Sequence, residues 1–309
     1  MTIYFSRKEE ELINSCRICG NIFFEKPLLI YKNMPSAAQY FPDKKSLNHD
    51  KGVDLIVCQC SGCGLVQLKN SPVSYYREVI RAAGFSKEMQ EFRNKQFKKI
   101  INDFNLNNKK IIEVGCGHGE YLSIMQELAI NSFGIEKSKD GVKNCISKGL
   151  RVSTGYIEEE NYEIENTPFD FFFILNFLEH LPNINAVLKG IYNNIKDNGI
   201  GLIEVPNFDM ILKKNIFSEF IRDHLFYFTI GTLKSTLLIN GFEVVSCKII
   251  WHDYIISAIV KKIKKTHSKH SNQFQNKIIK NFKKIELNHF YQLQDKIKID
   301  IKDYIKDFE

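Results

Sequence analysis

A run of closely spaced glycines between two apolar stretches carries the residue types that a nucleoside site requires. Residues 111–120 read Ile-Ile-Glu-Val-Gly-Cys-Gly-His-Gly-Glu. Glycine lets a loop bring its backbone close to a ligand, because it has no Cβ and tolerates positive φ. About twenty residues further on, Glu136 ends the next apolar stretch, where a carboxylate accepts hydrogen bonds from ribose hydroxyls. The loop and the acid together predict a nucleoside-binding site.

The spacing of the glycines distinguishes between nucleoside cofactors. A dinucleotide loop has the pattern G-x-G-x-x-G, and its third glycine opens the helix that receives the pyrophosphate. Here the third glycine, Gly119, comes one position early, and Glu120 takes the place of the fingerprint glycine. A carboxylate there would repel a pyrophosphate but would tolerate a sulfonium ligand with a zwitterionic methionine end. The alternative is an ordinary glycine-rich turn.

Residues 113–119 resemble motif I of the class I S-adenosylmethionine-dependent methyltransferases, and Glu136 matches the second acid of that family. The resemblance implies that Gly115 and Gly117 approach the methionine part of the cofactor. It also implies that Glu113 orders the ammonium group through the loop or through water, and that Glu136 holds the ribose.

The cysteines of the first seventy residues form two pairs with metal-ligand spacing. Cys16 and Cys19 are separated by two residues, as are Cys60 and Cys63, and a glycine follows each pair. Two such pairs complete a four-sulfur site of the structural zinc type, with no position left open for chemistry. Cys58 is left over. A redox-active cysteine pair is the alternative.

The sequence around these cysteines is similar to that of the zinc-containing sugar methyltransferases, which include C-methyltransferases of nucleotide-linked deoxysugars. The matching patterns are C-R-x-C-G at residues 16–20, P-x-A-A-Q at 35–39 and C-x-x-C-G-L-V-Q at 60–67. The likeness covers about residues 14–260. Many relatives carry a second α/β domain after this point, and we expect this chain to lack it.

Two histidines are candidates for handling the acceptor proton. Residues 176–182, Asn-Phe-Leu-Glu-His-Leu-Pro, resemble the family's segment beside the sulfonium, which places Asn176 at the cofactor. His180 in this segment could bond the acceptor or orient another side chain. Alternatively, it is a helix-initiating histidine bonded to the backbone.

The pair Asp223-His224 matches an acid–histidine pair of the sugar C-methyltransferases, in which the histidine is the base. An imidazole suits this role because its pKa lies near the working pH. Asp223 could bias His224 through its charge. Ile221 stands where those relatives have a tyrosine, so oxygen methylation is at least an equal alternative to methylation of a carbon next to a ketone. A structural histidine is the other reading of His224.

Tyrosines complete the candidate site. The family contributes a tyrosine to the acceptor pocket just after the zinc module, where Tyr75 and Tyr76 stand, and we select Tyr76. Tyr156 and Ile157 follow the third expected strand, where relatives often have an acid that contacts the adenine amino group. Tyr156 could stack on the adenine instead. Core or surface packing is the alternative for these rings.

Alternating apolar and amphipathic stretches predict the scaffold. Strands are expected at 110–115, 132–136, 151–154, 169–175, 201–205, 242–247 and 251–260, and helices at 120–129, 139–148 and around 232–240. Short apolar strands suit a parallel sheet covered on both faces. The predicted fold class is α/β, a doubly wound class I methyltransferase sheet with a small N-terminal zinc-binding module and a C-terminal helical tail.

Four regions follow from these elements. They are a zinc-binding module (1–72), a helical connector (73–108) with a break at Gly84, a cofactor-binding methyltransferase domain (109–260) and an amphipathic basic helical tail (261–309). The apolar stripe of the tail includes Ile278, Phe282, Ile285, Leu293, Ile297, Ile301, Tyr304 and Phe308. Such a stripe must bury itself on the core or on another chain, so a homo-oligomer formed through these helices is one expectation.

Charge and hydropathy limit the partners. The 309 residues carry a formal charge of +7, and residues 261–309 hold thirteen lysines, no arginine and six acids, which accounts for all of it. Without arginine this tail lacks the bidentate donor for phosphate or guanine, so nucleic acid is not the expected partner. No stretch reaches the roughly twenty apolar residues of a membrane span, and no secretory signal is evident, so we expect a cytoplasmic protein.

The function predicted from the sequence is methyl transfer from S-adenosylmethionine, with a structural Zn²⁺ in the N-terminal module. The expected acceptor is a hydroxyl or a ketone-adjacent carbon of a nucleotide-linked sugar or another saccharide precursor of a surface polysaccharide. The alternatives are a methyltransferase acting on RNA or on another small phosphate-containing precursor, and a non-catalytic cofactor-binding scaffold.

Overall fold

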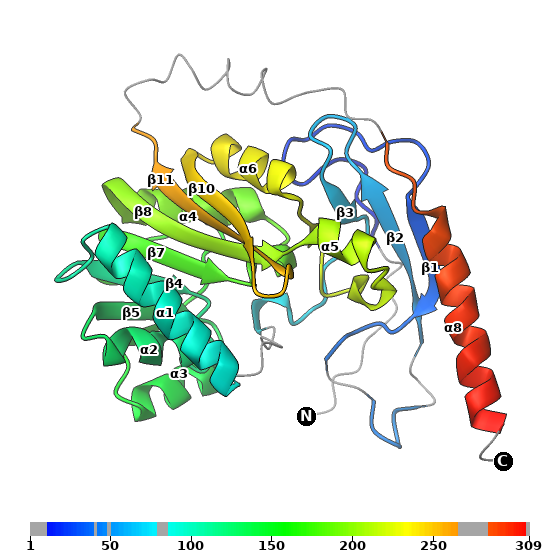
Figure 1. The fold of residues 1–309 in the computed structure, drawn as a ribbon, viewed down its shortest axis with the longest axis horizontal. Coiled ribbons are helices and arrows are strands. Elements are labelled where there is room, and N and C mark those ends of the chain that lie inside the picture. The colour runs from blue at the N-terminus through cyan, green and yellow to red at the C-terminus, as the bar shows by residue number, and fades with distance from the viewer. Residues whose placement is uncertain (1–10, 40–41, 48–50, 79–85, 265–283, 307–309) are drawn as a thin grey trace.

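Two β-sheets organise the chain, and Figure 1 shows them side by side. The computed structural model describes residues 11–39, 42–47, 51–78, 86–264 and 284–306. The larger sheet belongs to the region after residue 109, and the smaller sheet is built mainly from the cysteine-rich region. Each sheet supplies one part of the site described below.

The larger sheet has seven strands in the order β10-β11-β8-β7-β4-β5-β6. Its strands are β4 (Lys110–Val114), β5 (Asn131–Glu136), β6 (Val152–Thr154), β7 (Phe169–Leu175), β8 (Ile195–Pro206), β10 (Phe242–Ile250) and β11 (Ile255–Lys262). Strands β4 to β8 pair in parallel, and β11 and β10 extend the sheet beyond β8 as an antiparallel hairpin. The order reverses between β4 and β7, which is where ligands bind in open α/β sheets.

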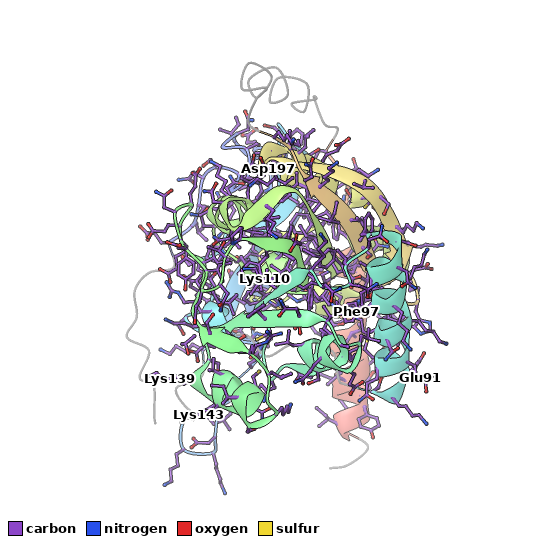
Figure 2. All side chains as sticks on the ribbon, turned by 90° about the vertical axis from the view of Figure 1, so that its left-hand side faces the viewer. Glu91, Phe97, Lys110, Lys139, Lys143 and Asp197 are labelled. Atoms are coloured by element: carbon purple, nitrogen blue, oxygen red, sulfur yellow. The ribbon has the colours of Figure 1, made fainter. Side chains whose placement is uncertain are left out.

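Helices cover both faces of this sheet. They are α1 (Lys87–Asp103), α2 (Glu120–Glu127), α3 (Lys139–Ser147), α4 (Ile184–Asn194) and α6 (Ile230–Ile239). Side chains of a strand point alternately to opposite faces, so Phe171 and Phe173 of β7 share a core cluster with α1 and α2, whereas Phe172 and Ile174 share one with α4 and α6. Figure 2 shows Phe97 between α1 and the sheet.

A buried ion pair fastens α1 to the sheet. Arg93 of α1 and Glu204 of β8 are both fully buried and bonded to each other. Gln96 Nε2 and Ser257 Oγ donate to the other carboxylate oxygen at 2.6 and 2.7 Å. The guanidinium also lies over the rings of Phe92 and Tyr121. These contacts fix the helix that leads from the cysteine-rich region into the larger sheet.

The smaller sheet has the order β1-β2-β3-β9. Its strands are β1 (Leu29–Met34), β2 (Val53–Gln59), β3 (Val66–Leu68) and β9 (Phe226–Tyr227). Strand β9 comes from the methyltransferase region and pairs antiparallel with β3, so that region completes the sheet. This pairing joins the two parts of the chain.

Helix α8 (Asn288–Lys306) packs beside β1, as Figure 1 shows. Phe290 is buried in the core of the smaller sheet, and the Ile30 amide donates to the hydroxyl of Tyr291 at 2.7 Å. Ile301 and Ile305 further along the helix are exposed. The apolar stripe of α8 is therefore buried on the chain's own core only in its first turns.

Short elements connect the larger ones. They are the 3₁₀ helices η2 (Tyr76–Glu78), η3 (Leu178–His180) and η4 (Phe217–Glu219), and the helix α5 (Phe208–Lys213). No helix among the described residues combines the length and the apolar character that a membrane span needs.

Several predicted bounds differ from the observed ones. The predicted connector helix is the short η2 followed by α1, and Gly84 lies outside the described residues. The hairpin turn includes Trp251, so β11 begins at Ile255, four residues later than expected, and continues to Lys262. In the tail, Ile278, Phe282 and Phe308 also lie outside the described residues.

Candidate functional site

The glycine loop occupies the end of β4, at the switch point of the sheet. The amides of Gly115 and Cys116 both donate to the Ile135 carbonyl, at 2.9 and 3.2 Å, so the loop folds back over β5. Gly115 has a φ of 71°, and a Cβ built there would lie 2.8 Å from the Phe177 ring. A larger residue at this position would be strained and would also press on Phe177.

Glu136 ties this loop to the next helix. Its two carboxylate oxygens accept from the Gly117 amide and the Ser138 amide, each at 2.8 Å. Ser138 caps α3 by accepting from the Gly141 amide. An ionised carboxylate has about four acceptor positions, so Glu136 can hold the loop and still accept from ribose hydroxyls.

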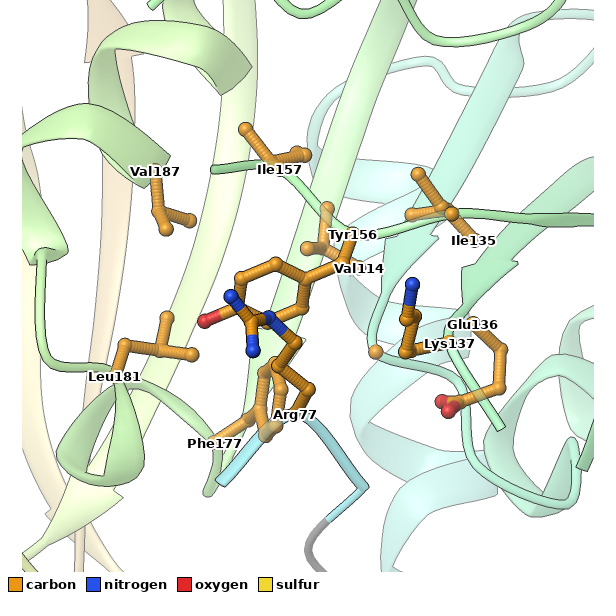
Figure 3. Close-up of a pocket in the computed structure, with 12 residues that line it drawn as sticks. Arg77, Val114, Ile135, Glu136, Lys137, Tyr156, Ile157, Phe177, Leu181 and Val187 are labelled. Carbon is orange, nitrogen blue, oxygen red and sulfur yellow. The ribbon is translucent and has the colours of Figure 1, made fainter. Parts of the chain in front are cut away.

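A pocket opens at this edge of the sheet (Figure 3). It is lined by Arg77, Val114, Gly115, Ile135, Glu136, Lys137, Gly155, Tyr156, Ile157, Phe177, Leu181 and Val187. Leu181 and Val187 lie on one side, and Glu136 and Lys137 lie on the other. Apolar walls suit an adenine and the acid suits a ribose, so the residues fit an adenosyl cofactor.

Four of the predicted cofactor residues line this pocket, namely Gly115, Glu136, Tyr156 and Ile157. The other four lie close behind it. Gly117 donates its amide to Glu136, and Gly119 begins α2 in the left-handed conformation. Glu113 is fully buried on β4. Asn176 follows β7 with a φ of 47°.

Arg77 was not predicted as a site residue. Its Nε lies 2.6 Å from Glu158 Oε1, and its guanidinium lies 4.6 and 5.6 Å from the ring centroids of Tyr76 and Tyr156. Figure 3 shows its side chain in front of Phe177. The sequence signal that could have identified Arg77 is its position directly after the two adjacent tyrosines, Tyr75 and Tyr76. Apolar lining residues such as Val187 carry no chemical signal in a sequence.

His180 belongs to η3, between the lining residues Phe177 and Leu181 in the sequence, and its ring centroid lies 6.5 Å from that of Phe177. Its Nδ1 is 2.8 Å from the Asp223 main-chain carbonyl. A carbonyl only accepts, so Nδ1 carries the hydrogen, and Nε2 of the neutral ring is an acceptor. The alternative of a backbone-bonded histidine agrees with this contact of Nδ1, while Nε2 lies 3.8 Å from Glu179 Oε1.

His224 packs against His180, with ring centroids 4.8 Å apart. Burial lowers the pKa of both imidazoles, and the His180 charge lowers the pKa of His224 further, to well below 6.5. The charge of Asp223 opposes this effect at His180. Both rings are therefore neutral at pH 7, the state in which an imidazole accepts a proton.

The structure brings Tyr75 to the acid of the predicted Asp223-His224 pair. The Tyr75 hydroxyl donates to Asp223 Oδ1 at 2.9 Å, and the Ala38 amide donates to the same oxygen at 3.0 Å. Ala38 belongs to the P-x-A-A-Q stretch between the cysteine pairs. Tyr76 instead packs its ring on Tyr156, 6.0 Å between centroids. Tyr75 therefore contacts the acid, and Tyr76 contacts the cofactor pocket.

The four predicted metal ligands meet at one point. One sulfur from each of Cys16, Cys19, Cys60 and Cys63 lies within 4.8 Å of the others, with 3.7 Å between Cys16 and Cys63 and 3.4 Å between Cys19 and Cys60. A tetrahedral Zn–S distance of about 2.3 Å places sulfurs about 3.8 Å apart. The donor set therefore fits a structural zinc.

Neighbouring groups donate hydrogen bonds to these sulfurs. Gln67 Nε2 donates to Cys16 Sγ at 3.2 Å, and Asn21 Nδ2 donates to Cys19 Sγ at 3.4 Å. The Gly62 amide donates to Cys60 Sγ. Such donors stabilise negative charge on sulfur and orient it, as the supporting residues of a metal site do.

A doubly wound sheet with a glycine loop at the switch point, and an acid at the end of the second strand beside a pocket, is typical of the S-adenosylmethionine-dependent methyltransferases as a class. Residues 89–247 match the methyltransferase-domain family. The chain belongs to this family.

Two curated relatives are similar to the chain. C-methyltransferase NovU of Streptomyces niveus is 24% identical over 245 residues, which cover 75% of this chain and 57% of that protein. A ubiquinone biosynthesis O-methyltransferase of Rickettsia prowazekii is 28% identical over 115 residues, which cover 35% of this chain and 45% of that protein. The chain thus spans about half the length of these relatives.

Among solved structures, the protein PH0226 of Pyrococcus horikoshii OT3 has a TM-score of 0.49 and 14% sequence identity, and the match covers 62% of this chain and 100% of that chain.

Proposed function

We propose that this protein transfers a methyl group from S-adenosylmethionine to a hydroxyl, or to a carbon next to a ketone, of a nucleotide-activated sugar or another surface-polysaccharide precursor. His224 is the general base. Membership of the methyltransferase-domain family supports the reaction class. The observation that carries the proposal is the pair of neutral histidines, the buried His180 and the half-buried His224, with the His180 ring centroid 6.5 Å from that of the pocket residue Phe177.

The bound cofactor supplies an electrophilic methyl group on a sulfonium, whose sulfur leaves as a neutral thioether. The protein must then hold the acceptor in line, exclude water and remove one proton. His224 takes that proton on a ring nitrogen. His180 either orients the acceptor or replaces His224 as base.

A structural Zn²⁺ is the second part of the proposal. Cys16, Cys19, Cys60 and Cys63 occupy all four positions of a tetrahedral ion, so the metal would have no role in the reaction. Its task is to hold the module in the shape that delivers Ala38 to Asp223.

The test uses His224→Gln and His180→Gln in the purified full chain. The assay measures methyl transfer from labelled S-adenosylmethionine to a pool of nucleoside diphosphate hexoses, with total tRNA as a second pool. His224→Gln should lower turnover by about 100-fold or more, a typical share of general base catalysis. S-adenosylhomocysteine affinity, measured by calorimetry, should change less than threefold.

Turnover that survives in both variants would remove the histidines from the mechanism. Methylation of tRNA but not of sugars by the wild-type protein would replace the acceptor class.

A further inference from the structure

One side of the adenosyl pocket is supplied by a segment that lies far from the others in the sequence. Arg77 is the one lining residue, among those that the structure describes, that precedes residue 109, and it belongs to η2 between the cysteine module and α1. Figure 3 shows its side chain in front of Phe177, between Leu181 and Lys137. The sequence motifs of the cofactor site do not include this residue, so its contacts need their own explanation.

Arg77 is tied to a second segment of the pocket lining. Its Nε donates to Glu158 Oε1 at 2.6 Å, and Glu158 directly follows the lining residue Ile157. Its guanidinium also lies 5.6 Å from the centroid of the Tyr156 ring, within the range of a cation–π contact. Tyr156 and Glu158 belong to the loop after β6, whereas Arg77 precedes α1. These contacts therefore join two separate parts of the chain at the pocket.

Tyr76 adds to the same connection. Its ring meets the Tyr156 ring edge-on, with 6.0 Å between centroids, and the Arg77 guanidinium lies 4.6 Å from the Tyr76 centroid. The ion pair is open to solvent, because the side chain of Arg77 is 36% exposed and that of Glu158 is 53% exposed. An exposed ion pair contributes little to folding stability. These contacts can therefore break and re-form without disturbing the core.

The cofactor has to enter this pocket, and its product has to leave, once in every turnover. A group that covers a bound ligand through weak contacts can shield it from water and still move aside. We infer that Arg77 and Glu158 form a clamp, which closes over the adenosyl cofactor and opens for release of the product. Arg77 is then a positioning residue that retains the cofactor and takes no part in the transfer of the methyl group. The inference goes beyond the proposed function, because it depends only on the cofactor and holds for any acceptor.

Release of S-adenosylhomocysteine from the purified full chain tests the clamp. Arg77→Met keeps an unbranched side chain but removes the ion pair and both cation–π contacts. The dissociation rate constant, measured by stopped-flow displacement, should rise about 5- to 50-fold, the combined range of one exposed ion pair and two cation–π contacts. Glu158→Gln removes the ion pair alone and should raise the rate about two- to fivefold. Unchanged release in Arg77→Met would overturn the inference.

Two matched controls remove similar contacts outside the pocket lining. Arg151→Met removes an exposed arginine that lies 4.3 Å from the centroid of the Phe133 ring, and Glu160→Gln removes an exposed ion pair with Lys189. Both controls should keep the wild-type release rate. The Tm of every variant should stay within about 3 °C of the wild-type value, since exposed pairs contribute little to stability. Faster release in a control, or a larger fall in the Tm of Arg77→Met, would attribute the effect to a loosened fold and overturn the inference.

A double variant separates a clamp from a direct contact between Arg77 and the cofactor. In a clamp the two side chains act together, so Arg77→Met/Glu158→Gln should release the product no faster than Arg77→Met alone. Raising NaCl from about 0.05 to 0.5 M should speed release from the wild type but hardly from Arg77→Met, because salt screens an exposed ion pair. Effects that multiply in the double variant, or the same salt dependence in both proteins, would overturn the inference. None of these measurements uses an acceptor, so their failure is distinct from failure of the proposed acceptor class.

Discussion

At the scale of single residues, His224 links stability to pH. Its pKa is depressed by burial and by His180, so below pH 6.5 the unfolded chain binds a proton that the folded chain does not. The free energy of unfolding should therefore fall as the pH drops from 6.5 toward the folded-state pKa. Urea denaturation at pH 7.5, 6.5 and 5.5 measures this loss, which should be smaller in His224→Gln.

Comparing the variant with the wild type removes the contribution of carboxylates that titrate in the same range, among them the half-buried Glu219, whose pKa is raised by desolvation. Methyl transfer should follow the folded-state ionisation of His224, with a rate that stays level from pH 8 down to 6.5 and declines only as the pH approaches the depressed pKa. Identical pH dependence of stability in the wild type and His224→Gln would contradict the depressed pKa.

Glu136 gives a prediction for cofactor affinity. Glu136→Gln keeps one acceptor oxygen for the loop but turns an amide group toward a backbone donor that it cannot satisfy. The Kd for S-adenosylhomocysteine should rise about 10- to 100-fold, since hydrogen bonds to a charged group are worth about 1.5–3 kcal/mol. Calorimetry measures the change, with the exposed Glu127→Gln on α2 as control. An unchanged Kd would exclude Glu136 from the cofactor site.

At the scale of elements, the two residues of the ion pair between α1 and β8 should contribute to stability together, so that losing one of them costs more than losing both. Arg93→Met leaves Glu204 buried with a charge that only Gln96 and Ser257 oppose. The loss of stability should be about 3–5 kcal/mol. The double variant Arg93→Met/Glu204→Gln should recover part of it, because a neutral amide oxygen can still accept from the two donors.

Denaturant titration of the two single variants and the double variant gives the coupling between these side chains. Lys99→Met, which removes an exposed ion pair on the same helix, should cost less than about 1 kcal/mol of stability. Additive losses for Arg93 and Glu204 would show that they do not interact.

The elements also show which parts of the fold the sequence could predict. Strands β4, β5 and β7 and helix α3 have local patterns, and their predicted bounds agree with the observed ones to within about one residue. Strand β9 has only two residues and exists because β3 pairs with it, so no local sequence pattern predicts it. Strand β8 begins at Ile195, well before the predicted 201, because Ile195 pairs with Phe169 of β7 and the register shifts before Ile200 pairs with Phe171.

At the scale of the whole molecule, the site also has one part that the sequence could predict and another part that it could not. The glycine loop and the cysteine pairs are short motifs, and the spacing of their residues is enough to predict the kind of ligand that each would bind. The Tyr75–Asp223–Ala38 contact needs three segments that are up to 185 residues apart, and only the assembled fold brings them together. A sequence motif predicts the ligand class, whereas the proposed acceptor site depends on how the two sheets meet.

The separation of the adenosyl pocket from the cysteine module leads to a prediction about metal removal. Apart from Arg77, every residue that lines the adenosyl pocket follows residue 109, whereas Ala38 and the partner strand of β9 belong to the cysteine module. Elemental analysis should find one zinc per chain. Loss of the ion, by chelation or in Cys60→Ser, should unfold the module and abolish most acceptor methylation, while S-adenosylhomocysteine affinity changes less than about threefold. Cys247→Ser, outside the module, should keep both zinc and turnover. A metal-free protein with full turnover, or one that loses cofactor affinity in parallel with turnover, would show that the cysteine module does not act through the acceptor side.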